Sequence, residues 1–320
     1  MIYDPPVFDS DIYGLNPTLK EELKRRNEQP QWARRRWLLE RASLRQRGAD
    51  DDRSRRFLYK YLSVNPDTSA DGLELKKLTD LLVRGELYLS STDQFNDPND
   101  FRAVVEFTKD PDSLQAWATR LALSNASLQG ASPSQLKQVV SSVVARALDN
   151  PQMIQGTYDQ AAQAFGVYCL SQNPRSHLMW AHYSRSHRGL CVQLDPARCL
   201  EVFAVAQTVR YTKDIPHITW PDDQANVLNG ALSKSDEWNY ESEVRYINRQ
   251  VKRASIKFDA NAATGVILGQ RFNENTRATQ WLADAIRERR VAGLPELKLY
   301  RAVRDPKSYA LAISRIKTID

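Results

Sequence analysis

Two glutamates in the polar run from Lys234 to Arg245 are the first candidates for chemistry. Glu241 and Glu243 are two residues apart, a spacing that places both on the same side of an extended strand. Carboxylates on one face repel each other, and the repulsion raises the pKa of one of them, as in acid–base pairs. Arg245 continues the row, so the alternative is an edge-strand ion pair between Glu243 and Arg245. A glutamate that is free of arginine is then the best catalytic candidate in the chain.

Three of the four histidines lie in one stretch, at His177, His182 and His187. On a helix, a five-residue step turns a side chain about 140° away from the starting face, unlike the i, i+4 pairs of zinc-binding helices. No cysteine or carboxylate stands at ligand spacing around them, so we expect no metal. The stretch either presents His182 and His187 to a pocket beside a strand at 189–194, or packs as a helix with hydrogen-bonded core histidines.

The segment 95–100 is dense in short polar side chains that hydrogen-bond their own backbone, which predicts a tight turn. The functional alternative is a loop that clamps a ligand hydroxyl or phosphate beside the strand end Ser90-Ser91. The loop residues that would contact the ligand are Phe95, Asn96 and Asp97.

Several familiar catalytic motifs are absent. The chain contains no GxGxxG, GxxxxGK[ST], GxSxG or HExxH sequence. Its three cysteines, Cys169, Cys191 and Cys199, cannot all pair within the chain and form no CxxC motif, which fits a reduced, cytoplasmic setting. Cys169 and Cys191 stand in apolar, strand-like runs, so we expect buried and inert thiols.

The composition is that of a globular protein. The 320 residues are 42% hydrophobic and 26% charged, with 12 Gly and 15 Pro, which excludes disordered, collagen-like and disulfide-scaffold classes. No apolar run approaches the roughly 20 residues that cross a bilayer, and the acidic start of the chain does not resemble a secretory signal. We therefore expect a soluble cytoplasmic protein with no membrane partner.

The net charge of +6 is concentrated in the segment Lys20–Arg47, which holds ten basic and four acidic residues. Tryptophans and leucines among the arginines predict an amphipathic helical arm that docks on the body. The alternatives are contact with nucleic acid or an acidic partner, or binding at a membrane surface. The arginines expected to contact such a partner are Arg34, Arg35 and Arg36. We expect the arm to occupy residues 1–55 and a single domain to occupy residues 56–320.

The elements behind these clusters predict an α+β fold with a mixed, largely antiparallel sheet, a helical insertion and the N-terminal helical arm. A helix is predicted from Asp71 to Gly85, because leucines recur at helical spacing between a capping residue and a helix-ending glycine. The region of about 111–165 is predicted to be mostly helical, with Ser132 and Gln135 placed for a capping box. Strands are predicted at 57–62, 87–91, 103–107, 167–170, 189–194, 202–211, 243–248, 265–268 and 297–303, and a further helix at 275–289.

Seven ordered blocks of the body, about residues 57 to 270, resemble the bacterial domain-of-unknown-function family numbered 2971. The blocks are LYKY at 58–61, LYLSSTDQFNDPND at 87–100, YCLS at 168–171, LMWAHYSRSHRGLCVQLD at 178–195, VRY at 209–211, K…WNYESEVR at 234–245 and VILG at 266–269. The basic arm lies outside these blocks. The activity of that family is unsettled, so this resemblance does not imply a function.

The chain also resembles ADP-ribosyltransferases, more remotely. Those enzymes open with a strand whose His or Arg holds NAD, a position that corresponds here to Lys60. A late-strand glutamate that bonds the ribose corresponds to Glu241 or Glu243. The residues that correspond to the strand packed on the nicotinamide are Tyr88, Ser90 and Ser91. The resemblance implies NAD as the substrate and an oxocarbenium-like transition state that a nearby carboxylate stabilises.

The first functional hypothesis is an NAD-consuming transferase or glycohydrolase with Glu241, Glu243 and His182 as catalytic residues. One alternative is a nucleic-acid-associated defence or effector module bound through residues 20–47. Another is a non-catalytic interaction or sensor protein. The expected substrate contacts are Tyr59, Lys60, Ser90, Ser91, Phe95, Asn96, Asp97, Trp180, Tyr183, His187, Trp238 and Arg245.

Overall fold

The computed structural model describes residues 57–64, 72–125, 128, 130–150, 152–203, 205–221, 228–273 and 277–318. The N-terminal arm (1–55), with Arg34, Arg35 and Arg36, lies outside the described residues, so the expectations for it stay predictions. The described residues form two compact units. Within the described ranges, unit 1 comprises 92–165 and 210–236, and unit 2 comprises 57–91, 166–209 and 237–318. The patterns in the sequence did not predict this division.

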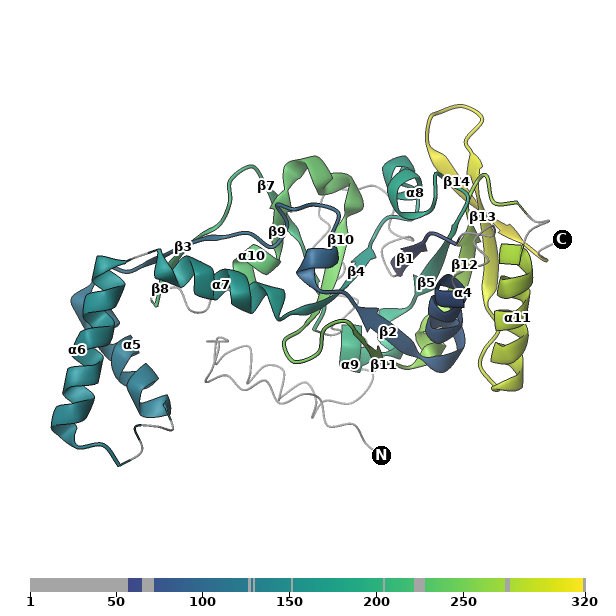
Figure 1. The fold of residues 1–320 in the computed structure, drawn as a ribbon. Helices are drawn as coiled ribbons and strands as arrows, with labels where there is room; N and C mark the ends of the chain where they lie inside the picture. The colour runs from purple at the N-terminus through teal and green to yellow at the C-terminus, as the bar shows by residue number, and fades with distance from the viewer. Residues whose placement is uncertain are drawn as a thin grey trace. The chain divides into compact units, whose positions relative to one another are not determined.

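Unit 2 is built on an eight-stranded sheet with the strand order β14-β13-β12-β5-β1-β4-β10-β6 (Figure 1). The strands are β1 (Leu58–Leu62), β4 (Gly166–Ser171), β5 (Leu190–Leu194), β6 (Gln207–Thr208), β10 (Glu243–Asn248), β12 (Ala263–Leu268), β13 (Lys298–Arg304) and β14 (Leu311–Ile316). Neighbouring strands run antiparallel except β12 and β13, which run parallel. The prediction of a mixed, largely antiparallel sheet is confirmed.

Helices cover both faces of this sheet. They are α4 (Gly72–Thr79), which continues into the π-helical turn η2 (Asp80–Arg84), α8 (His177–Tyr183), α9 (Leu200–Phe203) and α11 (Arg277–Val291). One core contains residues of α4, η2, α9 and α11, and the other contains residues of α8. The first helix ends at Gly85 as predicted, because the left-handed φ of 63° at this glycine lets its N–H bond back to the carbonyl of Asp80.

The alternation of side chains along β1 decides on which face of the sheet Lys60 lies. Leu58 and Leu62 pack in the core that contains α4 and α11. Tyr59 and Tyr61 pack in the core that contains α8. Successive side chains of a strand lie on opposite faces, so Lys60 shares the face of the two leucines. Lys60 therefore lies between two leucines on the same face of a central strand.

A buried arginine fastens α11 to the rest of unit 2. The guanidinium of Arg289 donates to the carbonyl oxygen of Leu82 on η2 and, at 3.0 and 2.9 Å, to those of Ala260 and Ala263. Its Nε donates to the carbonyl oxygen of Pro295 at 2.7 Å. Buried donors need such partners, and here one side chain joins the C-terminal helix to η2 and to the start of β12.

A second sheet of unit 2 has two antiparallel strands. These are β2 (Glu86–Leu89) and β11 (Ala254–Lys257). The leucines of β2 are buried in the core, whereas Glu86 and Tyr88 alternate with them. The register sets Glu86 opposite Lys257 and Tyr88 opposite Ser255. Alternation thus gives β2 one apolar side and one polar side.

Unit 1 contains the predicted helical insertion. Its elements are η3 (Thr92–Gln94), β3 (Val104–Phe107), α5 (Pro111–Ser124), α6 (Pro133–Asp149), α7 (Met153–Gln163), β7 (Arg210–Thr212), β8 (His217–Trp220), α10 (Leu228–Ala231) and β9 (Ser233–Ser235). The pairs β3–β8 and β7–β9 are parallel. The capping box at the start of α6 is present, because Ser132 Oγ accepts from the N–H of Gln135 and the Gln135 side chain accepts from the N–H of Ser132. The insertion predicted over about 111–165 is confirmed.

One predicted strand is wrong at its start. The strand expected over 202–211 is replaced by the helical turn α9 and by two short strands, β6 and β7. Val202 and Phe203 are buried in the core of unit 2 from this turn. Because both residues have high strand propensity, the tertiary contacts of this turn have overridden their local preference.

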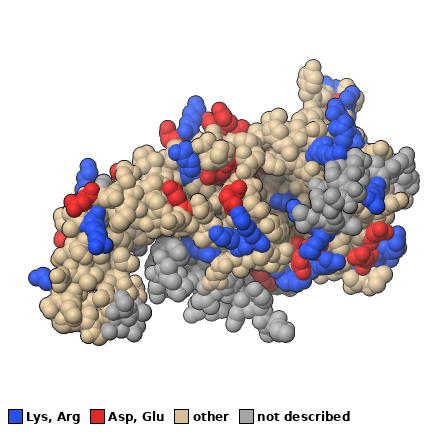
Figure 2. All heavy atoms as spheres, viewed as in Figure 1, with Lys and Arg blue, Asp and Glu red and all other residues tan. Residues whose placement is uncertain are grey.

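The described surface mixes charges of both signs. Figure 2 shows Lys and Arg side chains beside Asp and Glu side chains on the visible face. Within the described ranges, no helix combines the length and the apolar character needed to span a bilayer. The mixed surface agrees with a net charge that the sequence concentrates in Lys20–Arg47.

Candidate functional site

A pocket with a volume of about 330 Å³ lies within unit 2. Its walls come from β1 and the residues after it, from the helix α4–η2, from β2 and β11, and from β4 and α8. Pockets that bind small molecules have volumes of roughly 300–1,000 Å³. This pocket therefore has room for a small ligand, or for one part of a larger ligand.

Simple periodicities place the side chains that line the pocket. Every second residue of β2 and of the segment just after it lines the pocket, namely Glu86, Tyr88 and Ser90, while the leucines between them are buried. The helix α4–η2 contributes Lys77 and Asp80 to the lining, and these two residues share a helix face because they are three residues apart. The same alternation that builds the core thus turns polar groups toward the pocket.

Four of the predicted site residues line this pocket: Lys60, Ser90, His182 and Tyr183. Tyr88, which the ADP-ribosyltransferase resemblance implies as an aromatic wall, lines it as well. These residues come from β1, from the end of β2 and from α8, which are far apart in the sequence. Folding therefore brings three of the polar blocks together in unit 2.

Lys60 lies where apolar and aromatic groups surround its amine. Its Nζ donates to the carbonyl oxygen of Cys169 at 3.0 Å and lies 4.5 Å from the centre of the Tyr168 ring. Burial lowers the pKa of the Lys60 amine, and nearby Cys169 and Glu243 act in the opposite direction. The neutral amine is therefore favoured more than in an exposed lysine.

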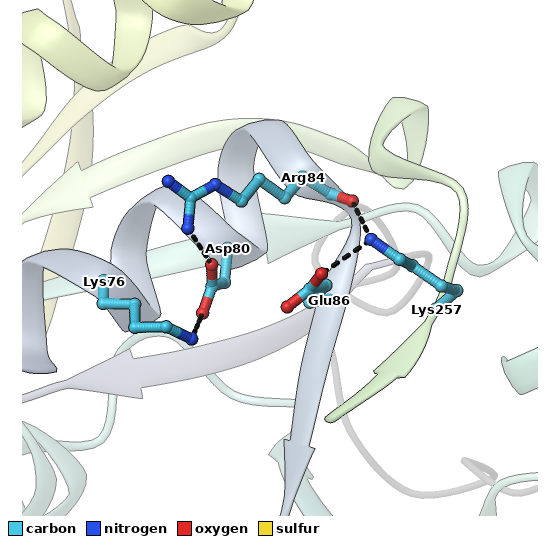
Figure 3. Close-up of polar contacts among 5 residues, drawn as sticks. All are labelled: Lys76, Asp80, Arg84, Glu86 and Lys257. Carbon is cyan, nitrogen blue, oxygen red and sulfur yellow. Dashed lines mark hydrogen bonds and ion pairs between the residues drawn. The ribbon is translucent and has the colours of Figure 1, made fainter. Parts of the chain in front are cut away.

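Both carboxylates of the pocket lining are held by cations (Figure 3). Asp80 accepts from Lys76 Nζ at 2.8 Å and from Arg84 at 2.9 Å, each about one helical turn away. Glu86 accepts from Nζ of its cross-strand partner Lys257 at 2.6 Å. The negative charge of the lining is therefore neutralised locally.

The two lysines of the lining, Lys60 and Lys77, form no ion pair among the described residues. Lys77 Nζ lies 6.0 Å from the centre of the Tyr88 ring. Apart from Lys60, four cationic side chains lie in or next to the lining, namely Lys77 and the three cations that hold the acids, against two carboxylates. This local excess of positive charge favours an anionic ligand.

Two hydrogen bonds join α8 to the 3-10 helix η7 (Asp236–Glu241). His182 Nδ1 and the Tyr240 hydroxyl share a hydrogen bond of 2.9 Å, and the Tyr183 hydroxyl donates to Glu241 Oε1 at 2.5 Å. The ring of Trp238 lies 6.4 Å from that of His182. The lining residues His182 and Tyr183 of α8 are thereby oriented by Tyr240 and Glu241 of η7.

The expected arrangement of the two glutamates is wrong. Glu241 ends η7, and Ser242 has a left-handed φ of 45°, so the strand β10 begins only at Glu243. The two carboxylates are therefore not successive positions on one side of a strand. Glu243 is instead held by Arg245, whose Nε and second guanidinium nitrogen donate to its two oxygens at 2.9 Å each. The ion pair between Glu243 and Arg245 is confirmed, but its expected place on an edge strand is wrong, because β10 lies between β4 and β6 and both side chains are buried.

Three further predicted contacts take part in the packing or bonding of unit 2. Tyr59 and Trp180 are buried in the core that contains α8. Ser91 Oγ accepts from Arg253 Nε at 2.8 Å. Trp180 supports the wall of the pocket, because it packs edge-on against the lining residue Tyr61 at 5.1 Å between ring centres.

His187 belongs to a tight turn after α8. Residues 185–187 all have left-handed φ angles, of 47°, 52° and 70°. The His187 ring stacks on Trp180, and its Nδ1 is buried with no hydrogen-bond partner among the described residues. Burial lowers the pKa of His187, and His177 and Arg271 add to this effect.

The described residues contain no group of three or more potential metal-ligating His, Cys, Asp or Glu side chains.

The segment 95–100 lies in unit 1 and forms the predicted turn. Asp97 Oδ1 accepts from the N–H of Asn99 at 2.8 Å, and the Phe95 ring packs edge-on against Phe101. Asp100 is ion-paired with Lys234, at 3.4 Å between Oδ2 and Nζ. These contacts stabilise the turn within unit 1. A ligand-clamping role for the residues Phe95, Asn96 and Asp97 stays a prediction.

Sequence reasoning missed several lining residues. They are Lys77, Asp80, Glu86, Tyr168 and Ser255. For Lys77 and Asp80, the available signal was their spacing beside the apolar face of a correctly predicted helix. Ser255 carried no signal, because the strand β11 was not predicted.

Comparison with known proteins gives one family. Residues 179–246 match the family described as "Protein of unknown function (DUF2971)". The matched segment contains the lining residues His182 and Tyr183 and both glutamates, Glu241 and Glu243. Neither the curated proteins nor the solved structures gave a match. These comparisons lend no support to the resemblance to ADP-ribosyltransferases.

Proposed function

We propose that unit 2 binds a small anionic ligand with an aromatic ring, and that the ligand is a nucleotide. The observation that carries this proposal is the lining of one pocket. It combines unneutralised positive charge with several rings. The rings belong to Tyr61, Tyr88, Tyr168, His182 and Tyr183.

The charge of the pocket supports a phosphate-bearing ligand. Lys77 is exposed at the lining and forms no ion pair among the described residues. A phosphate beside it would also be attracted by the cations that hold Asp80 and Glu86. Charge-assisted hydrogen bonds from lysine and arginine are the usual means of holding phosphate.

The rings support a ligand that carries a base. Aromatic side chains stack on any nucleobase, and each stacked base contributes roughly 1–3 kcal/mol by alanine substitution. A volume of about 330 Å³ lies near the lower end of small-molecule sites. We therefore propose that the pocket holds one base with its ribose and phosphate, which is half of a dinucleotide.

In its specific form, the proposal makes NAD the substrate. Cleavage breaks the bond between the nicotinamide nitrogen and the ribose carbon, and both electrons of that bond leave with nicotinamide. Water adds its oxygen to the ribose carbon and loses a proton, for which His182 is the acceptor in the lining. In this proposal, the hydroxyl of Tyr183, which donates to Glu241, is the polar group that stabilises the developing positive charge.

Binding is tested by calorimetric titration of the full chain with AMP, nicotinamide mononucleotide and inorganic phosphate. We expect Lys77→Ala to weaken binding of all three ligands. Tyr88→Ala is expected to weaken nucleotide binding about tenfold while leaving phosphate binding unchanged, because only a base stacks on the ring. Lys298→Ala, at an exposed position of β13, is the control. Nucleotide binding that neither pocket variant changes would refute the pocket as the site.

Catalysis is tested by measuring nicotinamide release from NAD. We expect Glu241→Gln to reduce release by about 100-fold, while Glu288→Gln on the exposed side of α11 leaves it unchanged. Unchanged release in both Glu241→Gln and Glu243→Gln would remove the carboxylate role. If the wild-type chain binds nicotinamide mononucleotide but releases no nicotinamide from NAD, the hydrolytic form of the proposal fails and the binding form stands.

A further inference from the structure

We propose that Lys60 is a nucleophilic amine that forms a covalent imine with an anionic aldehyde or ketone bound in the unit 2 pocket. Lys60 lines the pocket and is partly exposed to it. Its contacts are a backbone carbonyl and an aromatic ring, and it forms no ion pair with a carboxylate among the described residues. This inference uses the pocket of the proposed function but does not require the ligand to be a nucleotide.

The surroundings of Lys60 favour the reactive form of the amine. A lysine attacks a carbonyl only when it is neutral, and desolvation without a carboxylate partner is a recognised way to favour that form. The hydrogen bond to the carbonyl oxygen of Cys169 uses an N–H of Lys60 and leaves the lone pair of the neutral amine available. Burial of this amine acts in the same direction, since it lowers the pKa.

The other lysines near the pocket differ from Lys60 in a way that sets up the test. Lys76 and Lys257 form ion pairs with Asp80 and Glu86, and both have exposed side chains. Lys77 is exposed as well. An ion pair favours the charged ammonium, and exposure leaves it hydrated. Lys60 therefore combines a pocket-facing position with withdrawal from water.

The cations next to the lining indicate the class of carbonyl compound. Arg84 and Lys257 contact the lining residues Asp80 and Glu86 (Figure 3). A phosphate or carboxylate on the ligand would be attracted to this group and to Lys77. The expected ligands are thus small carbonyl compounds that also carry an anionic group.

The covalent step is balanced without an oxidant or a reductant. The Lys60 nitrogen lone pair attacks the carbonyl carbon, the carbon–oxygen π electrons move to oxygen, and one proton passes from the nitrogen to this oxygen to give a neutral carbinolamine. The hydroxyl group then takes up a proton and leaves as water, while the nitrogen lone pair forms the carbon–nitrogen double bond and the nitrogen loses its remaining proton. His182, which lines the same pocket, is the group available to donate the first of these protons and to take back the second.

The test uses pyridoxal 5′-phosphate as the probe, since it combines an aldehyde, a ring and a phosphate. The full chain is incubated with limiting probe, reduced with borohydride and mapped by peptide mass spectrometry. We expect Lys60 to carry at least about ten times more label than the exposed Lys257 or Lys298. Pyridoxal, which lacks the phosphate, should label Lys60 less. Lys60→Arg should abolish the preferential label, whereas Lys298→Arg, at an exposed position outside the pocket lining, should retain it.

Label distributed over exposed lysines with none on Lys60 would overturn the inference. This map of the wild-type chain needs no variant, so the inference stays falsifiable if Lys60→Arg fails to fold. Binding of AMP to the same preparation separates the two proposals. If AMP binds and Lys60 is not labelled, the imine is refuted and the nucleotide pocket stands. If Lys60 is labelled and AMP does not bind, the nucleotide proposal is refuted and the reactive lysine stands.

Discussion

Each unit holds a lysine that is largely withdrawn from water, and the two lysines have different partners. In unit 1, Lys234 lies 3.4 Å from Asp100, and their side chains are only 4% and 3% exposed. In unit 2, Lys60 contacts a backbone carbonyl and the Tyr168 ring, and forms no ion pair among the described residues. An ion pair keeps a buried lysine charged, whereas burial without one favours the neutral amine. The partner of a lysine therefore decides whether it supports the fold or is available for chemistry.

The largest effect should come from breaking the ion pair of unit 1. We expect Lys234→Met to lower the free energy of unfolding by about 3–5 kcal/mol, because Asp100 would stay buried without its lysine. Urea denaturation followed by tryptophan fluorescence measures this change. Lys298→Met, at an exposed position, is the matched control. A loss no larger than that of the control would contradict a structural role for Lys234.

The next largest effect on stability concerns Glu241 of unit 2, whose carboxylate accepts a hydrogen bond from the Tyr183 hydroxyl. Tyr183→Phe removes the hydrogen bond to the Glu241 carboxylate, and Tyr240→Phe removes the neighbouring bond to His182. Hydrogen bonds to a charged group contribute roughly 1.5–3 kcal/mol, and neutral ones roughly 0.5–1.5 kcal/mol. We therefore expect Tyr183→Phe to be the more destabilising variant in urea denaturation. Equal losses would show that the charge on Glu241 adds nothing to its bond with Tyr183.

The smallest effect is a pH dependence that isolates Lys60. The unfolded chain keeps the ordinary lysine pKa of 10.5, and burial lowers the pKa in the folded protein. Between these two values the unfolded state binds more protons, so stability rises with pH. The unfolding free energy of the wild type minus that of Lys60→Met should therefore increase as the pH approaches 10.5 from below. A difference that decreases over this interval would mean that the fold stabilises the Lys60 ammonium, which contradicts a reactive amine.

The elements that the sequence predicted correctly are those with local signals. The helix end at Gly85 and the capping box of Ser132 and Gln135 depend on residues within one helical turn. The main strands of unit 2 depend on short apolar runs. Such signals need no knowledge of distant contacts, which is why the fold class was predictable. The weakly patterned β11 and β14 carried no comparable signal and were missed.

The candidate site was harder to predict because it depends on single backbone angles and on distant partners. The separation of Glu241 from Glu243 follows from one left-handed serine, Ser242, and serine carries no sequence mark of that conformation. The ion pair of Lys234 with Asp100 joins segments that only the fold of unit 1 brings together. The sequence predicted which residue types matter, but not which of them would pair with each other.

The contacts of Arg289 have a consequence for the regulation of the pocket. Its guanidinium holds the carbonyl of Leu82, which lies 207 residues away in the sequence and directly follows Leu81, a residue of the pocket lining. The position of this wall of the pocket therefore depends on α11, a helix that contributes no residue to the lining. If the pocket binds the ligand proposed above, any event that loosens α11, such as proteolysis or the docking of another molecule, would change the affinity from a distance and leave every lining residue chemically intact.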